Sequence, residues 1–120
     1  MISQIFKSHV DKMILINLLD KIAYKHDTKY IFDNDCYKRA VMLNVLDEFI
    51  NEIRPYYHKS KQHYIDKKKS YKMLSTVIRH ICRLNGIFYK QQIVYSKSTY
   101  EIKYHIYIEN NAILVDVIKK

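Results

Sequence analysis

The feature that most limits how this chain can fold is its lack of flexible positions, because it contains one glycine, Gly86, and one proline, Pro55. These two residue types interrupt regular structure and build linkers most readily. The chain therefore has almost no material for linkers or low-complexity tails, and its 120 residues suffice for one domain with a modest core. We predict a single domain over residues 1–120, with a neutral helical half (1–58) and a basic half (59–120).

The neutral half has the residue spacing of amphipathic helices. Apolar residues at steps of three and four predict a helix over residues 2–26, and a second stripe predicts a helix over residues 35–53. The run 33–35 can cap this second helix, Pro55 ends it, and residues 28–32 have strand propensity. The apolar arc of the first helix is wide. We expect it to be covered by the rest of the domain or by a second copy of the chain.

The basic half is expected to contain one helix followed by antiparallel strands. Ser70 can cap a helix over residues 71–85, and Asn85–Gly86 is a natural stop because glycine tolerates the left-handed conformation. The alternation of apolar and polar residues predicts strands over residues 87–95, 100–109 and 112–118, with a hairpin loop at 96–99. The predicted fold class is α+β: three helices and a C-terminal antiparallel hairpin or meander, similar in order to a winged helix.

The connection between the second and third helices departs from a helix-turn-helix. In that motif a turn of about three or four residues joins the two helices. Here the sixteen residues 54–69 separate Ile53 from Ser70. Either a short helix lies within residues 56–65 or the motif is a different one, so the winged-helix similarity concerns only the order of the elements.

The positive charge of the chain is concentrated in its second half. Residues 1–58 carry eight Lys/Arg and eight Asp/Glu, whereas residues 59–120 carry thirteen and four, which accounts for the whole net charge of +9. A basic region on a small domain most often meets nucleic acid. The predicted partner is therefore nucleic acid, DNA rather than RNA.

The polar face of helix 71–85 is the best candidate for this contact. Lys72, Thr76, Arg79 and Arg83 are spaced by four, three and four residues, so they share one face, with His80 beside it. Arginine can bind guanine or phosphate through two N–H groups. A solvated helix or an acidic protein partner would suit the same face. The other predicted nucleic-acid-binding residues are Lys67, Lys68, Lys69, Lys90, Lys97 and Lys103.

Tyrosines offer a second kind of contact, since aromatic rings stack on unpaired bases. Tyr100 and Tyr104 lie on the apolar side of their predicted strand, so core packing is expected there. Tyr107, beside Lys103 and His105, is the better stacking candidate.

Two strings resemble parts of catalytic motifs. His80–Arg83 matches the HxxR string of tyrosine recombinases, but the chain is too short for that catalytic domain. Glu101–Lys103 resembles the ExK half of a metal-dependent nuclease site, which needs a further carboxylate nearby, and residues 87–95 contain none. The six histidines have no zinc-binding spacing. We expect a non-enzymatic protein without cofactor or metal.

The remaining features concern compartment. Cys36 and Cys82 lie in apolar helical patterns without metal-ligand spacing, which predicts buried free thiols in a reducing compartment. No stretch approaches the roughly 18 uninterrupted apolar residues of a membrane span. Charged residues near the N-terminus, such as Lys7 and Lys12, interrupt any signal-peptide core. We expect an intracellular protein without a membrane partner.

A resemblance covers part of the chain, from about Tyr57 to Ile108. It rests on Ser60-Lys61, Tyr64, Tyr71, residues 76–83, residues 97–102 and Tyr104. In this pattern the chain resembles small uncharacterised basic proteins of large nucleocytoplasmic DNA viruses. The resemblance implies a virus factory, the host cytoplasm or nucleus, or a virion as the setting, and it implies no known activity. The alternative function is a protein-interaction or virion structural component that assembles, as a homodimer, through residues 2–26 and 35–53.

Overall fold

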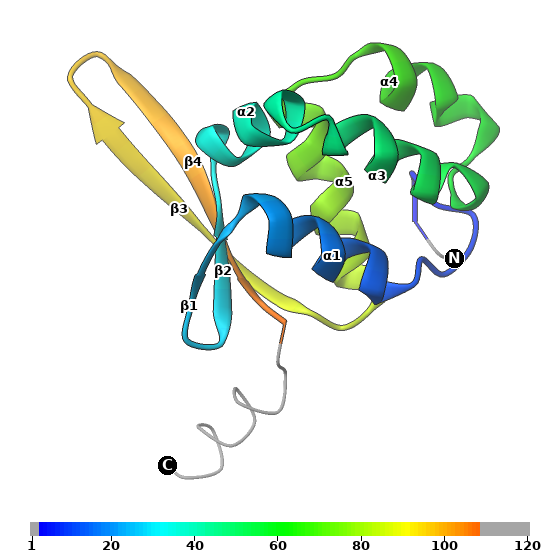
Figure 1. Cartoon of the computed structure of the whole chain (residues 1–120), viewed down its shortest axis with the longest axis horizontal. Helices are drawn as coiled ribbons and strands as arrows, with labels where there is room; N and C mark the ends of the chain where they lie inside the picture. The colour runs from blue at the N-terminus through cyan, green and yellow to red at the C-terminus, as the bar shows by residue number, and fades with distance from the viewer. Residues whose placement is uncertain (1–2, 109–120) are drawn as a thin grey trace, which may run out of the picture.

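The computed structural model describes residues 3–108, which form an α+β fold with five α-helices and a four-stranded antiparallel sheet (Figure 1). The predicted fold class, α+β, is confirmed. The helices are α1 (Lys12–Ile22), α2 (Asn34–Met42), α3 (Val45–Ile53), α4 (Gln62–Lys67) and α5 (Tyr71–Leu84). The strands are β1 (Tyr24–His26), β2 (Lys29–Phe32), β3 (Phe88–Ser96) and β4 (Thr99–Tyr107).

The sheet joins the two halves of the chain. Its strand order is β1-β2-β4-β3, so β4 pairs with β3 on one edge and with β2, from the first half, on the other. His105 is aligned with Ile31 on one side and with Lys90 on the other. The β3–β4 hairpin was predicted, but its second neighbour was not. The predicted third strand of the meander, residues 112–118, lies outside the described residues.

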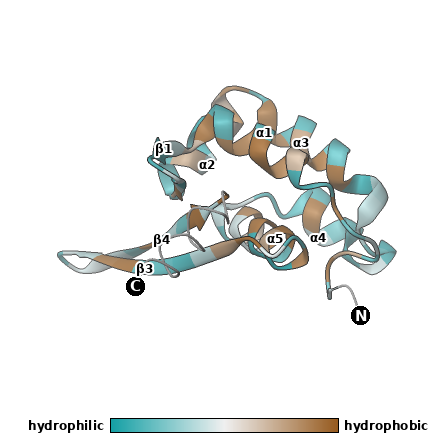
Figure 2. Ribbon diagram, turned by 90° about the horizontal axis from the view of Figure 1, so that it is seen from below, coloured by the Kyte–Doolittle hydropathy of each residue, from teal (hydrophilic) through white to brown (hydrophobic). Residues whose placement is uncertain are grey.

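Helices cover one face of the sheet (Figure 2). That inner face carries the buried side chains of Tyr30, Phe32, Tyr104 and Ile106. Because successive residues of a strand point to opposite faces, the neighbouring positions form an outer face. The outer face includes the side chains of Lys29, Phe88, Lys90, Gln92, Lys103, His105 and Tyr107.

The hydrophobic core lies between α1, α2, α3 and α5 and the inner face of the sheet. The predicted apolar arc of α1 is buried inside the chain, where Leu15, Leu18, Leu19 and Ile22 pack in the core. The arc therefore needs no second copy to cover it, and the homodimer stays a prediction. Both cysteines are buried and free, as predicted.

The first predicted helix was too long. Helix α1 begins at Lys12, where the side chain of Asp11 accepts the N–H of Met13 at 3.0 Å. The residues before it run alongside residues 56–58: the N–H of His58 donates to the carbonyl of Ile5 at 2.8 Å. Apolar periodicity reports burial, and here an extended segment is buried as well as a helix.

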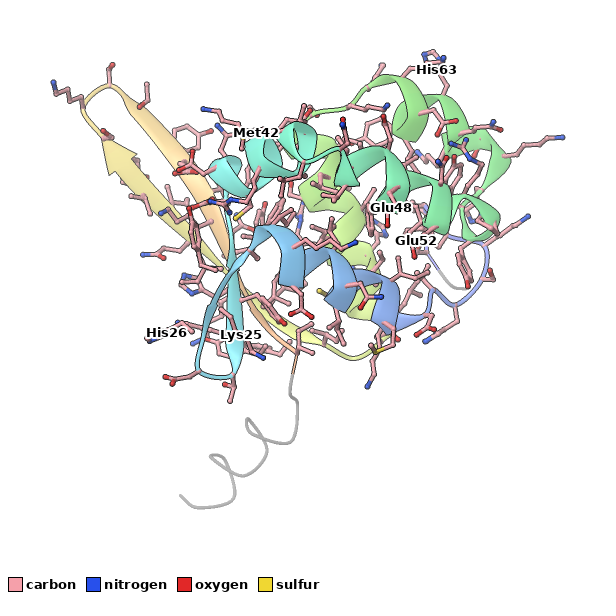
Figure 3. The ribbon with its side chains drawn as sticks, in the orientation of Figure 1. Lys25, His26, Met42, Glu48, Glu52 and His63 are labelled. Carbon is pink, nitrogen blue, oxygen red and sulfur yellow. The ribbon has the colours of Figure 1, made fainter. Side chains whose placement is uncertain are left out.

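The second predicted helix, 35–53, is two helices. The break lies at Asn44, whose φ of +61° is left-handed, a conformation that Asn adopts more readily than most residues. The chain turns there and leaves Val41, Met42 and Leu43 exposed, with Met42 74% accessible and pointing away from the body (Figure 3).

The connection between the second and third predicted helices, residues 54–69, is ordered by short helices. After two 3-10 turns, Arg54–Tyr56 and Lys59–Lys61, helix α4 leads through three residues, 68–70, into α5. The sequence left open whether a short helix lies within residues 56–65. The structure has one, displaced to Gln62–Lys67.

One carboxylate fastens this segment. Asp66 accepts the hydroxyl of Tyr57 at 2.8 Å and Nη1 of Arg54 at 2.7 Å. Burial works to raise the pKa of Asp66, but these two hydrogen bonds hold it below its ordinary value. Burial, and then Asp66, raise the pKa of Tyr57 to about 12. These bonds therefore hold the beginning of the segment that precedes α5 against its end.

The predicted hairpin is tighter than expected. The strands run to Ser96 and from Thr99, so two residues, Lys97 and Ser98, make the turn, with Lys97 at a φ of +52°. The far part of β3 and β4 extends beyond the helices as a two-stranded ribbon (Figure 1). We call the hairpin β3–β4 the ribbon.

Candidate nucleic-acid interface

Helix α5 forms where it was predicted and presents the candidate face. The Ser70 hydroxyl oxygen caps it by accepting the N–H of Met73 at 3.0 Å. One side of α5 is buried in the core. The other side carries the residues predicted to bind nucleic acid, and the helix contains no Asp or Glu. We call this set the α5 strip: Lys72, Thr76, Arg79, His80 and Arg83.

The ribbon lies along one flank of the α5 strip. The Arg79 guanidinium stands 5.3 Å from the centre of the Tyr104 ring, and Nη1 of Arg83 donates to the hydroxyl of Tyr89 at 2.7 Å. Lys61 is close enough on the other flank to affect the pKa of His80. The strip therefore lies between the ribbon and the region of Lys61.

The members of the strip are not equally available. Lys72 and Arg83 are exposed, whereas Thr76, Arg79 and His80 are half-buried. The Thr76 hydroxyl donates to the carbonyl of Lys72 at 2.8 Å and accepts Nη2 of Arg79 at 3.2 Å. The predicted phosphate bond from Thr76 therefore competes with bonds inside the helix. Lys72 and Arg83 are the exposed cations of the strip, and neither forms an ion pair among the described residues.

The pKa of His80 reflects its burial and the positive charges around it. Burial, followed by the nearby charges of Arg83, Arg79 and Lys61, lowers the pKa of His80 from 6.5 to about 4. His80 is therefore neutral at pH 7 and adds no charge to the strip. Three cations acting together on one imidazole indicate a surface where positive charge is not compensated.

This depressed pKa predicts acid sensitivity. His80 is neutral in the fold, so its contribution to stability is complete above the unfolded-state pKa of about 6.5 and is lost as the pH falls towards about 4. With a discount for solvent screening, we expect a loss of about 1 kcal/mol in the free energy of unfolding across that window. Urea unfolding at the two ends of the window measures it. The same titration of His80→Gln should be flatter, and equal slopes would contradict the assignment.

A cleft lies between the ribbon, α5 and the start of α2. Its volume is about 820 Å³, and its lining includes Lys72 and Arg79 of α5 and Tyr100 of β4. Glu101 also lines it, but one oxygen of its carboxylate accepts the N–H of Asn34 at 3.0 Å. Asp35 lines the cleft as well, so its two acidic side chains balance its two basic ones, and the cleft joins the α5 strip to Tyr100 of the ribbon without extending the positive charge.

The lysine run lies in the turn between α4 and α5. Lys67, Lys68 and Lys69 are all exposed. Lys69 forms an ion pair with Asp47, which leaves Lys67 and Lys68 uncompensated among the described residues. These two extend the basic surface from the N-terminal end of the α5 strip.

The remaining predicted residues do not join the strip. Lys97 lies at the tip of the ribbon, whereas Lys90 and Lys103 belong to the outer face of the sheet. Lys103 forms an ion pair with Asp33 at 3.6 Å, so its charge is compensated. The predicted single docking face is therefore wrong in this respect, because β4 presents alternate residues to opposite sides.

The ExK string has a structural role in this arrangement. Glu101 and Lys103 both contact the beginning of α2, through Asn34 and Asp33. Among residues 3–108, no group of three or more His, Cys, Asp or Glu side chains is placed to hold a metal ion.

No family model, curated protein or solved structure matches this chain. The interface therefore has to be judged from its own geometry. No helix within residues 3–108 is long and apolar enough to cross a membrane.

Sequence reasoning missed several residues of these surfaces. Tyr89 and Tyr104 hold the two arginines of the strip, and Lys29 joins the outer face through the pairing of β2 with β4. Strand alternation placed Tyr104 in the core, where it is buried, and the same alternation could have identified Tyr89. Nothing in the sequence signals the pairing that brings Lys29 next to β4.

Proposed function

We propose that this chain is a non-enzymatic nucleic-acid-binding protein that docks on duplex DNA through the α5 strip. The observation that carries the proposal is the positive charge of that strip, because α5 contains no Asp or Glu and its exposed cations Lys72 and Arg83 form no ion pair among the described residues. Lys72 and Arg83 would contact phosphates or bases, and Lys67 and Lys68 would contact the backbone beside them. The resemblance of residues 57–108 to proteins of large DNA viruses would place this binding in a viral setting.

The order of the elements supports a winged-helix mode of docking. Helix α4, a turn of three residues and α5 resemble a helix-turn-helix, and the ribbon follows α5 as a wing. Lys97 would lie at the tip of this wing, and Tyr95 and Tyr100, 77% and 64% accessible, would lie beside it. Helix α4 is short, so the similarity to a helix-turn-helix supports this mode of docking, but the proposal does not rest on that similarity.

A second candidate function is assembly with a protein partner through the N-terminal helices. Its support is the run Val41, Met42 and Leu43, three consecutive exposed apolar residues between α2 and α3. A chain that forms a defined oligomer and does not bind duplex DNA would favour this function.

The test of DNA binding is a pair of charge-matched double variants. Lys72→Ala with Arg83→Ala removes the two exposed cations of the strip and should weaken duplex binding, measured by fluorescence anisotropy, by about 10-fold or more. Lys21→Ala with Lys25→Ala removes the same charge from α1 and β1, and Lys25 lies across the molecule from α4 (Figure 3). This control should bind as the unmodified chain does. Equal losses of duplex affinity in the two double variants would show that binding depends on net charge alone, and they would overturn the assigned surface.

A further inference from the structure

We propose that the outer face of the sheet is a second nucleic-acid site, which binds unpaired bases of a single strand on the rings of Phe88 and Tyr107. This site is distinct from the α5 strip, because the strip contacts the inner face of the sheet through Tyr89 and Tyr104, whereas Phe88 and Tyr107 belong to the outer face. The proposal goes beyond duplex binding and does not depend on it.

Two aromatic rings lie side by side on this face. Phe88 and Tyr107 are directly aligned across the β3–β4 pair, and their ring centres are 5.4 Å apart with an interplanar angle of 40°. Phe88 is 46% accessible, so its ring is open to a ligand. Paired aromatic side chains on an open antiparallel sheet are a recurrent platform for stacking bases.

The charge around the rings is positive. Nζ of Lys29 stands 5.9 Å from the centre of the Tyr107 ring, and Lys90 is exposed two residues along β3 from Phe88, opposite His105. Lys29, Lys103 and Lys90 all act on His105, whose pKa burial and these charges lower. Lys103 is neutralised by Asp33, so Lys29 and Lys90 are the cations available to a phosphate backbone.

His105 and Gln92 form a polar pair on the same face. Nε2 of His105 lies 2.7 Å from the amide oxygen of Gln92, and these residues are two residues from Tyr107 along β4 and four residues from Phe88 along β3. Nδ1 of His105 is buried and has no hydrogen-bond partner among the described residues. Gln92 can exchange its bond to His105 for one to the edge of a base, because an amide both donates and accepts.

The shape of the face favours a single strand over a duplex or a protein. In a duplex the bases are stacked inside, where rings on a flat sheet cannot reach them, whereas unpaired bases can lie on such rings. A protein partner would be expected to meet a larger apolar area than two rings, and the two free lysines select a polyanion. The common ligand is an unpaired base with its phosphate, which either DNA or RNA can supply.

The experiment measures anisotropy with labelled oligothymidylate and oligouridylate of about ten nucleotides, using the full chain. Phe88→Ala should weaken binding by about 10-fold, because an aromatic platform contributes that much or more per base, and Phe88→Tyr should keep it. Lys90→Ala retains both rings and should lower the salt slope by about 0.7, the value for one phosphate of a single strand. The preferred oligonucleotide identifies DNA or RNA as the source.

The α5 variants separate this proposal from the proposed function. Phe88→Ala should leave duplex binding unchanged, and Lys72→Ala with Arg83→Ala should leave single-strand binding unchanged. Phe88-dependent binding to oligothymidylate without any duplex binding would support the outer face alone. Absence of binding to both oligonucleotides, or equal binding by the unmodified chain and Phe88→Ala, would overturn the proposal.

Discussion

Raising the salt concentration from about 50 to about 200 mM should weaken duplex DNA binding by about a thousandfold. Each phosphate that a cation neutralises releases counterions, so the logarithm of the association constant falls with the logarithm of salt by about 0.9 per contact. The basic surface around α5 offers six cations without an acidic partner among the described residues, enough for such a slope. These cations are Lys61, Lys67, Lys68, Lys72, Arg79 and Arg83.

The slope distinguishes a defined surface from general attraction to a basic protein. Lys72→Ala with Arg83→Ala should lower the slope by about 1.8, since two phosphate contacts are lost. Lys21→Ala with Lys25→Ala should leave it unchanged. Anisotropy titrations at four or more salt concentrations give each slope directly. A slope close to zero for the unmodified chain would show that phosphates are not neutralised, and the proposed function would fall with it.

The sequence was most informative where local signals agreed with one another. Helix α5 has a capping serine, a buried apolar stripe and the sequence's single glycine just beyond its end, and it forms within one residue of its predicted bounds. The hairpin was also predictable, because the alternation of β4 continues through Tyr107. Both features depend on residues close together in the chain.

The missed features depend on contacts between distant residues. Between Asp35 and Ile53 the signal for a break is Asn44, which tolerates the left-handed conformation, but the apolar stripe that continues across it predicts one uninterrupted helix. Residues 3–11 have an apolar pattern but run beside residues 56–58, a pairing that only the folded chain defines. Tertiary packing overrides a local pattern in both places.

The candidate surface was predictable in part for the same reason. The members of the α5 strip share a helix face, which spacing alone establishes. The strands required more, because Lys90, Lys97 and Lys103 belong to one hairpin yet lie on different surfaces. Periodicity places them on faces, but which face is covered by helices is decided by how β2 pairs with β4.

That pairing depends on one buried ring. Phe32, the last residue of β2, is fully buried, is aligned with Tyr104 of β4, and stacks on Tyr71 of α5 with ring centres 5.3 Å apart. Tyr71 in turn donates its hydroxyl to the carbonyl of Ile102. Phe32 thus holds α5 against the sheet, and the next residue, Asp33, caps α2. The orientation of both proposed surfaces follows from this contact.

Phe32→Ala should therefore be the most destabilising single substitution proposed here, with a loss of about 3 to 5 kcal/mol in the free energy of unfolding. Loss of the ring leaves a cavity where β2, β4 and α5 meet, and none of these three backbones can collapse to fill it. Urea unfolding followed by circular dichroism gives the midpoint and slope for each variant. Met42→Ala is the matched control, because Met42 is exposed and its loss should change stability by less than about 0.5 kcal/mol. A loss below about 1 kcal/mol for Phe32→Ala would show that β2 is not fixed to α5 as described, and the division of the lysines between two faces would lose its basis.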